Sequence, residues 1–344
     1  MNLTNGWTIM RLRLPIDRQT LLLLGAVAIA VVFPARGQAA EMFEWVVYGA
    51  IALLFFLYGA RLSPKAVWQG LLHWRLQGLV FLFTFAVFPL LGLLAVLVLR
   101  PVMSDPLVAG ILFLTLLPST VQSSIAFTSI AGGNVPAALT SASLSNLVGV
   151  VVTPLLVMAL MHSSGLGFGL DQIQKIALQI LAPFAAGQAM RPLIGAFLTR
   201  HRPLTAFVDR LSILLVVYAA FSEGMNAGVW SSIGWSDLAL TVLASCVILL
   251  IVLLATTWTS RKLGFSRADE IAIVFCGSKK SMATGIPMAG ILMPGPALAM
   301  MVLPLMLFHQ IQLFACAWMA QRYAERAPTD PSDAIGAPAM SARR

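Results

Sequence analysis

Charged side chains are scarce in this sequence: Asp, Glu, Lys and Arg together make up 10% of the 344 residues. A soluble globular domain carries about 25% charged and about 45–50% apolar residues. This chain is instead 59% hydrophobic, with a mean hydropathy of +0.89. The shortage of charge excludes an ordinary soluble domain, because so much apolar surface must face lipid. Apolar runs of about 20 residues recur along the chain, so we expect an all-α polytopic membrane protein.

Cysteine and histidine are also sparse. The three cysteines, Cys246, Cys276 and Cys316, lie inside apolar runs and have neither a disulfide framework nor metal-type spacing. The histidines expected in loops show no metal-ligand spacing either; they are His73, His162 and His201. We therefore expect no metal centre and no organic cofactor, and only sodium or a proton as a coupling ion.

The net charge of +9 reflects how the chain is oriented in the membrane. Ten spans are expected, at roughly 20–35, 42–60, 77–99, 106–131, 136–161, 173–192, 207–226, 237–258, 268–293 and 296–321. With the N-terminus in the cytoplasm, 17 lysines and arginines fall on the cytoplasmic side and 3 on the other. This asymmetry follows the positive-inside rule. It predicts a multi-pass cell-membrane protein with both termini cytoplasmic, not a nucleic-acid partner; the compact chain favours a bacterial inner membrane.

The two ends of the chain lie outside the spans. Residues 1–19 are expected to be a cytoplasmic segment and residues 324–344, rich in Pro, Ala and charge, a disordered tail. The stretch from Arg11 to Arg18 followed by "LLLLGAVAIAVVF" and "GQAA" also resembles a cleavable signal peptide. Cleavage there would leave nine spans.

Two spans carry helix-breaking or polar residues at mid-depth. Span four reads "GILFLTLLPSTVQSSIAFTSIAGGN", and span nine contains "AIVFCGSKKSMATGIPMAGILM", with Gly277 and Pro287 around Lys279 and Lys280. A charge at the centre of a membrane helix costs roughly 2.5–3.5 kcal/mol, and broken backbone is tolerated only where it lines a protein-enclosed cavity. Taken alone, span four could instead be a kinked structural helix whose hydroxyls bond back to its own carbonyls.

The breaks are five spans apart, which predicts two inverted repeats, residues 20–161 and 162–323. Interrupted segments at matching positions indicate the central site of a transporter. The polar residues in and beside the two breaks are the candidates for that site: Ser119, Thr120, Gln122, Ser123, Ser124, Ser143, Asn146, Ser278, Lys279, Lys280 and Ser281.

Three segments resemble the bile acid:sodium symporter family of secondary transporters. They are "LLPSTVQSSIAFTSIAGGNVPAALTSASLSNLVGVVVTPLL", "DEIAIVFCGSKKSMATGIPMAGIL" and "LPLMLFHQIQLF". The chain most resembles the branch with "FCGSKKS" in place of the glutamate-containing motif. The resemblance implies a panel domain of spans 1, 2, 6 and 7 and a core domain of spans 3–5 and 8–10. In the core the two broken helices would cross, and access would alternate by an elevator-like motion.

The sodium ligands that the resemblance implies are only partly present. Two fall at Ser123 and Ser124, where a weak sodium site stays open. The other implied positions are Ala138 and Ala142 (with Thr140, Ser141, Ser143 and Asn146 adjacent), Phe275 for the glutamate, Lys279 for a glutamine, and Thr84 for a second glutamine. A hard cation needs oxygen ligands, so losing the carboxylate and gaining an ammonium leaves a poor site. We do not expect two intact sodium sites.

The two lysines are expected to act differently, because neighbouring helical residues point about 100° apart. We expect Lys279 to replace sodium as a tethered cation and Lys280 to face the substrate cavity. Protonation of a buried lysine could be coupled to transport, and half-helix N-termini favour an anionic substrate. Alternatively, one lysine hydrogen-bonds the carbonyls of a broken helix and holds the breaks together.

Other polar residues support the site less strongly. Glu223 could be a proton carrier, an anion at the cavity mouth or a solvated end-of-helix residue. His309 and Gln310 resemble a His-Asn pair of the family, although a lone membrane histidine is more often a packing residue. The supporting candidates are Thr84, Thr140, Ser141, Glu223, His309 and Gln310.

The function favoured is secondary transport of an amphipathic organic anion, bile-acid-like or another organic acid, by a monomer or homodimer. Sodium-independent transport is favoured over sodium symport because the carboxylate is missing. An intramembrane Ser–Lys hydrolase is disfavoured because Ser278 and Lys279 are adjacent and point apart, and no G-x-S-x-G elbow or H-E-x-x-H is present. A channel would need repeated filter elements, which are absent from the sequence. We therefore expect a protein that is not an enzyme.

Overall fold

The computed structural model describes residues 18–61, 73–161, 177–228, 231, 233–292 and 295–326, and the regular structure in these ranges is helical. The expected N-terminal segment up to residue 17 and the tail from 327 lie outside them. In the described part, six helical stretches are long and apolar enough to cross a membrane: Gln38–Arg61, Trp74–Leu99, Val135–Met161, Pro203–Asn226, Trp235–Lys262 and Ala297–Glu325. The prediction of an all-α polytopic membrane protein is confirmed.

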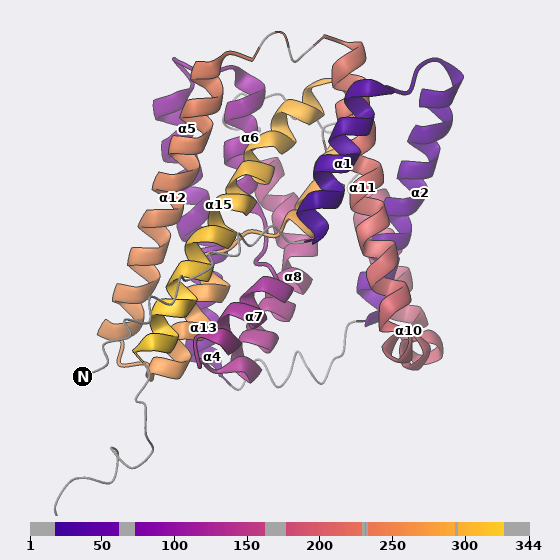
Figure 1. Cartoon of the computed structure of the whole chain (residues 1–344). Helices are drawn as coiled ribbons and strands as arrows, with labels where there is room; N and C mark the ends of the chain where they lie inside the picture. The colour runs from indigo at the N-terminus through magenta and orange to yellow at the C-terminus, as the bar shows by residue number, and fades with distance from the viewer. Residues whose placement is uncertain are drawn as a thin grey trace, which may run out of the picture.

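Four helices form a first group, at the right in Figure 1. They are α1 (Arg18–Val32), α2 (Gln38–Arg61), α10 (Ala182–Arg200), which continues the π-helix η3 (Ala177–Leu181), and α11 (Arg202–Asn226). α10 packs along α2, and α11 packs against α1 and α2. Glycines allow α2 and α10 to touch: a Cβ on Gly59 would meet the Phe184 carbonyl, and one on Gly187 would meet the Phe56 carbonyl. Such small-residue contacts are typical of membrane helix pairs.

The second group holds the remaining helices, at the left and centre of Figure 1. They are α4 (Trp74–Leu82), the π-helix η1 (Phe83–Val87), α5 (Phe88–Leu99), α6 (Asp105–Leu116), α7 (Gln122–Ile130), α8 (Val135–Leu156), the π-helix η2 (Val157–Met161), α12 (Trp235–Lys262), α13 (Arg267–Gly277), α14 (Met282–Leu292) and α15 (Ala297–Glu325). α15 packs against α6 and α12, and α11 joins the two groups through α14 and α15.

Both helices expected to be broken are interrupted. α6 ends at Leu116 and α7 begins at Gln122, with Leu117 extended (φ −75°, ψ 155°). A residue before proline avoids the helical region, so Pro118 explains this end. The second break, 278–281, lies between α13 and α14. Pro287, expected to contribute, lies inside α14 instead, so that part of the prediction is wrong.

The boundaries differ most at the sixth expected span, 173–192. Residues 173–176 lie outside the described ranges, and the helix formed by η3 and α10 extends to Arg200. α11 also begins earlier than the expected 207, with Pro203 in its first turn. Proline suits this position because its missing N–H has no helical partner there.

Candidate functional site

The two helix breaks meet through one backbone–backbone and one side chain–backbone hydrogen bond. The Ser281 N–H donates to the Pro118 carbonyl at 2.8 Å, and the Ser119 hydroxyl donates to the Cys276 carbonyl at 2.6 Å. Both serines are buried. A buried backbone group needs a partner, and the breaks supply partners to one another. Ser119 and Ser281, predicted at the site, therefore hold the breaks together.

A hydroxyl cluster lies beside this junction. Ser124 donates to the Phe275 carbonyl at 2.8 Å, and the Thr120 hydroxyl lies 2.8 Å from that of Ser123 and 3.0 Å from that of Ser124. The two positions proposed for weak sodium binding, Ser123 and Ser124, thus both lie within hydrogen-bond distance of Thr120. Their hydroxyls, however, are engaged with Thr120 and with a backbone carbonyl.

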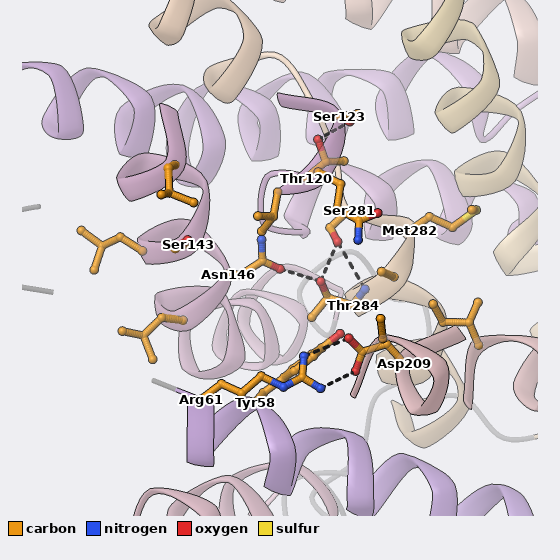
Figure 2. Close-up of a pocket in the computed structure, with 18 of the residues that line it drawn as sticks. Tyr58, Arg61, Thr120, Ser123, Ser143, Asn146, Asp209, Ser281, Met282 and Thr284 are labelled. Atoms are coloured by element: carbon orange, nitrogen blue, oxygen red, sulfur yellow. Dashed lines mark hydrogen bonds and ion pairs between the residues drawn. The ribbon is translucent and has the colours of Figure 1, made fainter. Parts of the chain in front are cut away.

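Asn146 on α8 links both breaks. Its Nδ2 donates to the Ser119 carbonyl at 2.5 Å, and its Oδ1 accepts from the Thr284 hydroxyl at 2.8 Å. The Thr284 hydroxyl lies 2.6 Å from that of Ser281, as the dashed lines in Figure 2 show. The Ser145 hydroxyl accepts from the Ser119 N–H at 3.0 Å. Asn146 was predicted at the site; Ser145 and Thr284 were missed.

The ammonium of Lys280 is fully buried and bound to two carbonyls. Nζ donates to Thr84 O at 2.8 Å and to Leu117 O at 2.7 Å, and it lies 4.1 Å from the ring centroid of Phe88. The first break frees the Leu117 carbonyl. The π-helix η1 frees the Thr84 carbonyl, because the Phe88 N–H bonds to Phe83 O instead. The expectation that Lys280 faces the substrate cavity is not met.

Gln312 on α15 clamps the backbone at the second break, and sequence reasoning missed it. Its Oε1 accepts from the Lys280 N–H and its Nε2 donates to the Lys280 carbonyl, both at 3.0 Å. The same Nε2 lies 2.8 Å from His309 Nδ1. A glutamine within an apolar span was a usable signal, since polar side chains are costly in lipid.

Lys279 is also fully buried, but its Nζ has no hydrogen-bond partner within the described residues. The Nζ lies 4.2 Å from the ring centroid of Phe127 and 5.3 Å from that of Phe275. The adjacent lysines thus lie in different surroundings, one bound to carbonyls and one between aromatic rings.

A cavity of about 800 Å³ opens between the two helix groups. On one side it is lined by Tyr58, Arg61, Phe184, Asp209 and Arg210, and on the other by residues of α7, α8, α14 and α15. Figure 2 shows Arg61 and Asp209 across from Asn146 and Thr284. Eight predicted residues line the cavity: Thr120, Gln122, Ser123, Thr140, Ser143, Asn146, Ser281 and His309.

The cavity wall carries charge that the site prediction missed. Arg61 forms a bidentate ion pair with Asp209, with both N–O distances 3.0 Å, and also donates to the Thr205 carbonyl at 3.3 Å. Arg210 on the same wall is exposed. Two arginines against one aspartate leave the lining net positive. Arg61 was visible in the sequence, but only as a charge that sets orientation.

Other predicted residues do not line the cavity; besides both lysines they are Ser119, Ser124, Ser278, Thr84, Ser141, Glu223 and Gln310. The Ser278 hydroxyl donates back to the Val274 carbonyl, and the Ser141 hydroxyl is buried without a partner in the described part of the chain. Glu223 is half-buried on α11. Thr84 contributes its carbonyl rather than its side chain.

These residues do not fit a sodium ion of the type that the resemblance implies. Sodium requires several free oxygen ligands, yet Ser124 bonds to the Phe275 carbonyl and Lys280 holds the Thr84 and Leu117 carbonyls. In the described part of the chain the ion pairs are Arg61–Asp209, Arg100–Asp105 and Arg261–Glu270, and none of them brings a carboxylate to either lysine. A positive ion beside two buried ammonium groups would also be repelled.

Comparisons with known proteins identify relatives over most of the chain. The family model described as "SBF-like CPA transporter family" matches residues 17–325. "Uncharacterized protein PA2026" of Pseudomonas aeruginosa is 55% identical over 90% of this chain and 93% of its own length. "Putative symporter YfeH" of Escherichia coli is 52% identical over the same shares. "Sodium/bile acid cotransporter 7" of Xenopus tropicalis is 29% identical over 78% of this chain and 79% of its own.

Proposed function

The chain belongs to the SBF-like CPA transporter family, and on this premise we propose that it is a secondary transporter of an amphipathic organic anion. The observation that carries the proposal is the cavity between the two helix groups, with a net-positive lining and the paired helix breaks on one wall. Apolar residues such as Leu139, Leu147 and Phe184 share this lining. A substrate with an apolar body and one anionic group matches both properties of the wall.

The transport cycle proposed is alternating access between two inverted repeats, residues 20–161 and 162–323. The first helix group corresponds to the panel domain, and the second, with its paired breaks, to the core domain. Bonds between the breaks favour movement of the second group as one body, past the first group. Both termini are proposed to be cytoplasmic, in a cell membrane of the bacterial inner-membrane type.

Lys280 is proposed to be the built-in cation of this transporter. Its ammonium supports two carbonyls that lack helical partners, the task for which a bound cation would otherwise serve. This exchanges the roles expected from the sequence, in which Lys279 was the tethered cation. Transport is then independent of sodium. Sodium symport through a reduced site at Ser123 and Ser124 is the alternative, favoured by the names of distant relatives.

The test is uptake of radiolabelled taurocholate into proteoliposomes, with a sodium or a choline gradient. We expect saturable uptake above protein-free liposomes, at the same rate with either cation. A rate several-fold higher with sodium would overturn the built-in cation and favour symport. No uptake above protein-free liposomes would count against a bile-acid-like anion as substrate.

The lysine assignment is tested separately by thermal unfolding of Lys280→Gln in sodium and in choline. Removing the ammonium frees the two carbonyl oxygens and removes one of the two local positive charges, so sodium should stabilise the variant. Wild type should unfold at the same temperature in both salts. Stabilisation of wild type by sodium, with no added effect in the variant, would contradict the assignment.

A further inference from the structure

Lys279 is a buried charged residue at the junction whose hydrogen-bonding capacity is unused in the described residues. Its Nζ has three donors and no hydrogen-bond partner in the described residues, whereas Lys280 next to it makes two bonds. A buried charge without hydrogen bonds is unfavourable. The aromatic faces beside Nζ offset only part of this cost. The ammonium of Lys279 is therefore open to an anionic partner.

Phe127 connects Lys279 with the cavity, because it contacts the lysine and lines the cavity. Phe127, whose ring centroid is 4.2 Å from Nζ, is itself a residue of the cavity wall and is only half-buried. Ser281 and Met282, which follow Lys279 closely in the chain, line the same cavity. A rotation of the Phe127 ring about χ1 is the smallest change that would bring the cavity to the ammonium.

We propose that Lys279 binds the anionic group of the substrate, and that the Phe127 ring covers this subsite in the present structure and moves aside when the anion enters. The inference rests on the proposed function, of which it names the anion subsite. The fitting group is a carboxylate, sulfonate or sulfate on an apolar body, because the rest of the wall near Phe127 offers hydroxyl and apolar surface.

The other cations of the lining are less suited to this task. Arg61 already forms a bidentate pair with Asp209, so an anion would have to displace a carboxylate. Arg210 is exposed, where water and salt weaken its attraction for an anion. Lys279 combines full burial with unused donors, so an anion that reaches it is bound more strongly than at Arg61 or Arg210.

The first experiment measures the melting temperature in lipid nanodiscs, with taurocholate or its uncharged analogue cholamide. We expect taurocholate to raise the melting temperature of wild type and cholamide to raise it much less. Lys279→Met should fold with unchanged or higher stability, because Met has similar length and no charge to desolvate, but should bind taurocholate at least 10-fold more weakly. Lys262→Met is the matched control: it removes a lysine charge from an exposed position on α12 and should respond like wild type.

An equal response to taurocholate in Lys279→Met and wild type would overturn the subsite while leaving the proposed function intact. So would a marked loss of stability in Lys279→Met with full taurocholate binding, which would indicate a structural role. No response in wild type would instead count against the proposed substrate class. The Lys279 subsite would then be decided by a second experiment that needs no substrate.

This second experiment maps reductive methylation of the five lysines by mass spectrometry. Lys279 and Lys280 are both fully buried and should stay unmodified over short reactions of wild type. In Phe127→Ala, Lys279 should become reactive while Lys280 stays protected. If both lysines react in Phe127→Ala, the whole junction has opened. The deciding variant is then Phe127→Leu, which keeps more of the packing than alanine does. An unreactive Lys279 in both variants would overturn the proposal.

Discussion

At the scale of the residue, Lys280 illustrates what stabilises a charge inside a membrane protein. Its ammonium replaces lost water with the Thr84 and Leu117 carbonyls and the face of Phe88. The carbonyls need the ammonium equally, because their helices leave them without a partner. The adjacent Lys279 has none of these bonds. Spacing along the chain cannot distinguish the two lysines, since the carbonyls that bind Lys280 lie 196 and 163 residues away from it.

The importance of these bonds can be measured by replacing Lys280 with methionine. Each buried carbonyl left without a donor costs about 1–3 kcal/mol, and removing the buried charge offsets part of this loss. We expect Lys280→Met to lower the melting temperature in nanodiscs clearly, in contrast to Lys279→Met. A variant as stable as wild type would mean that the two carbonyls do not depend on the ammonium.

The clamp by Gln312 leads to a second residue-scale prediction. Gln312→Leu keeps the volume but leaves the Lys280 N–H and carbonyl without partners, so the free energy of unfolding should fall by about 2–4 kcal/mol. Gln77→Leu is the control, because Gln77 is equally buried and its amide atoms have no hydrogen-bond partner in the described residues. Chemical denaturation of both variants checks the difference. Equal losses would show that volume alone matters at both positions.

At the scale of the helix, the sequence predicted the two breaks, and its alternative role for one lysine, a hydrogen bond to a carbonyl of a broken helix, is confirmed for Lys280 and Leu117. Pro118 and the polar run "GSKKS" were sufficient to locate the breaks, since both act locally on the backbone. The π-helix around Thr84 and the clamp by Gln312 depend on contacts between distant helices, which periodicity does not encode. The Arg61–Asp209 pair was missed for the same reason, because Arg61 alone indicated only membrane orientation.

Close contact of helices α2 and α10 supports a third prediction. A Cβ on Gly187 would overlap the Phe56 carbonyl, which is backbone and cannot rotate away. Gly187→Ala should therefore push α10 off α2 and lower the melting temperature. Gly49→Ala, on the same α2 but with nothing within 4 Å of the added Cβ, should be neutral or stabilising by up to about 1 kcal/mol. Equal stability of the two variants would contradict this tight packing.

At the scale of the whole molecule, the main question is whether the two helix groups move past each other. α11 contacts α14 and α15 at their boundary, and the cavity lies in the same boundary. The polar bonds described here tie the breaks to α8 and α15 within the second group, whereas Gly290 of α14 faces Val216 and Ile51 through apolar contacts. Apolar surfaces without directional bonds can slide with little penalty, as an elevator-like motion requires.

A disulfide across this boundary tests the motion. A Cβ on Gly290 would lie 3.1 Å from Val216 Cγ1, close enough for Val216→Cys and Gly290→Cys to bond after a small adjustment. Cys246, which is exposed, would be replaced by alanine to prevent other pairings. Oxidation should reduce taurocholate uptake at least 10-fold. The taurocholate-induced rise in melting temperature should persist, because the crosslinked protein is held in a single conformation that still binds taurocholate.

Two controls accompany this experiment. Dithiothreitol should restore uptake, and each single-cysteine variant should be unaffected by oxidation. Full uptake by fully crosslinked protein would mean that the first and second helix groups need not separate here, and the elevator-like motion would have to be abandoned.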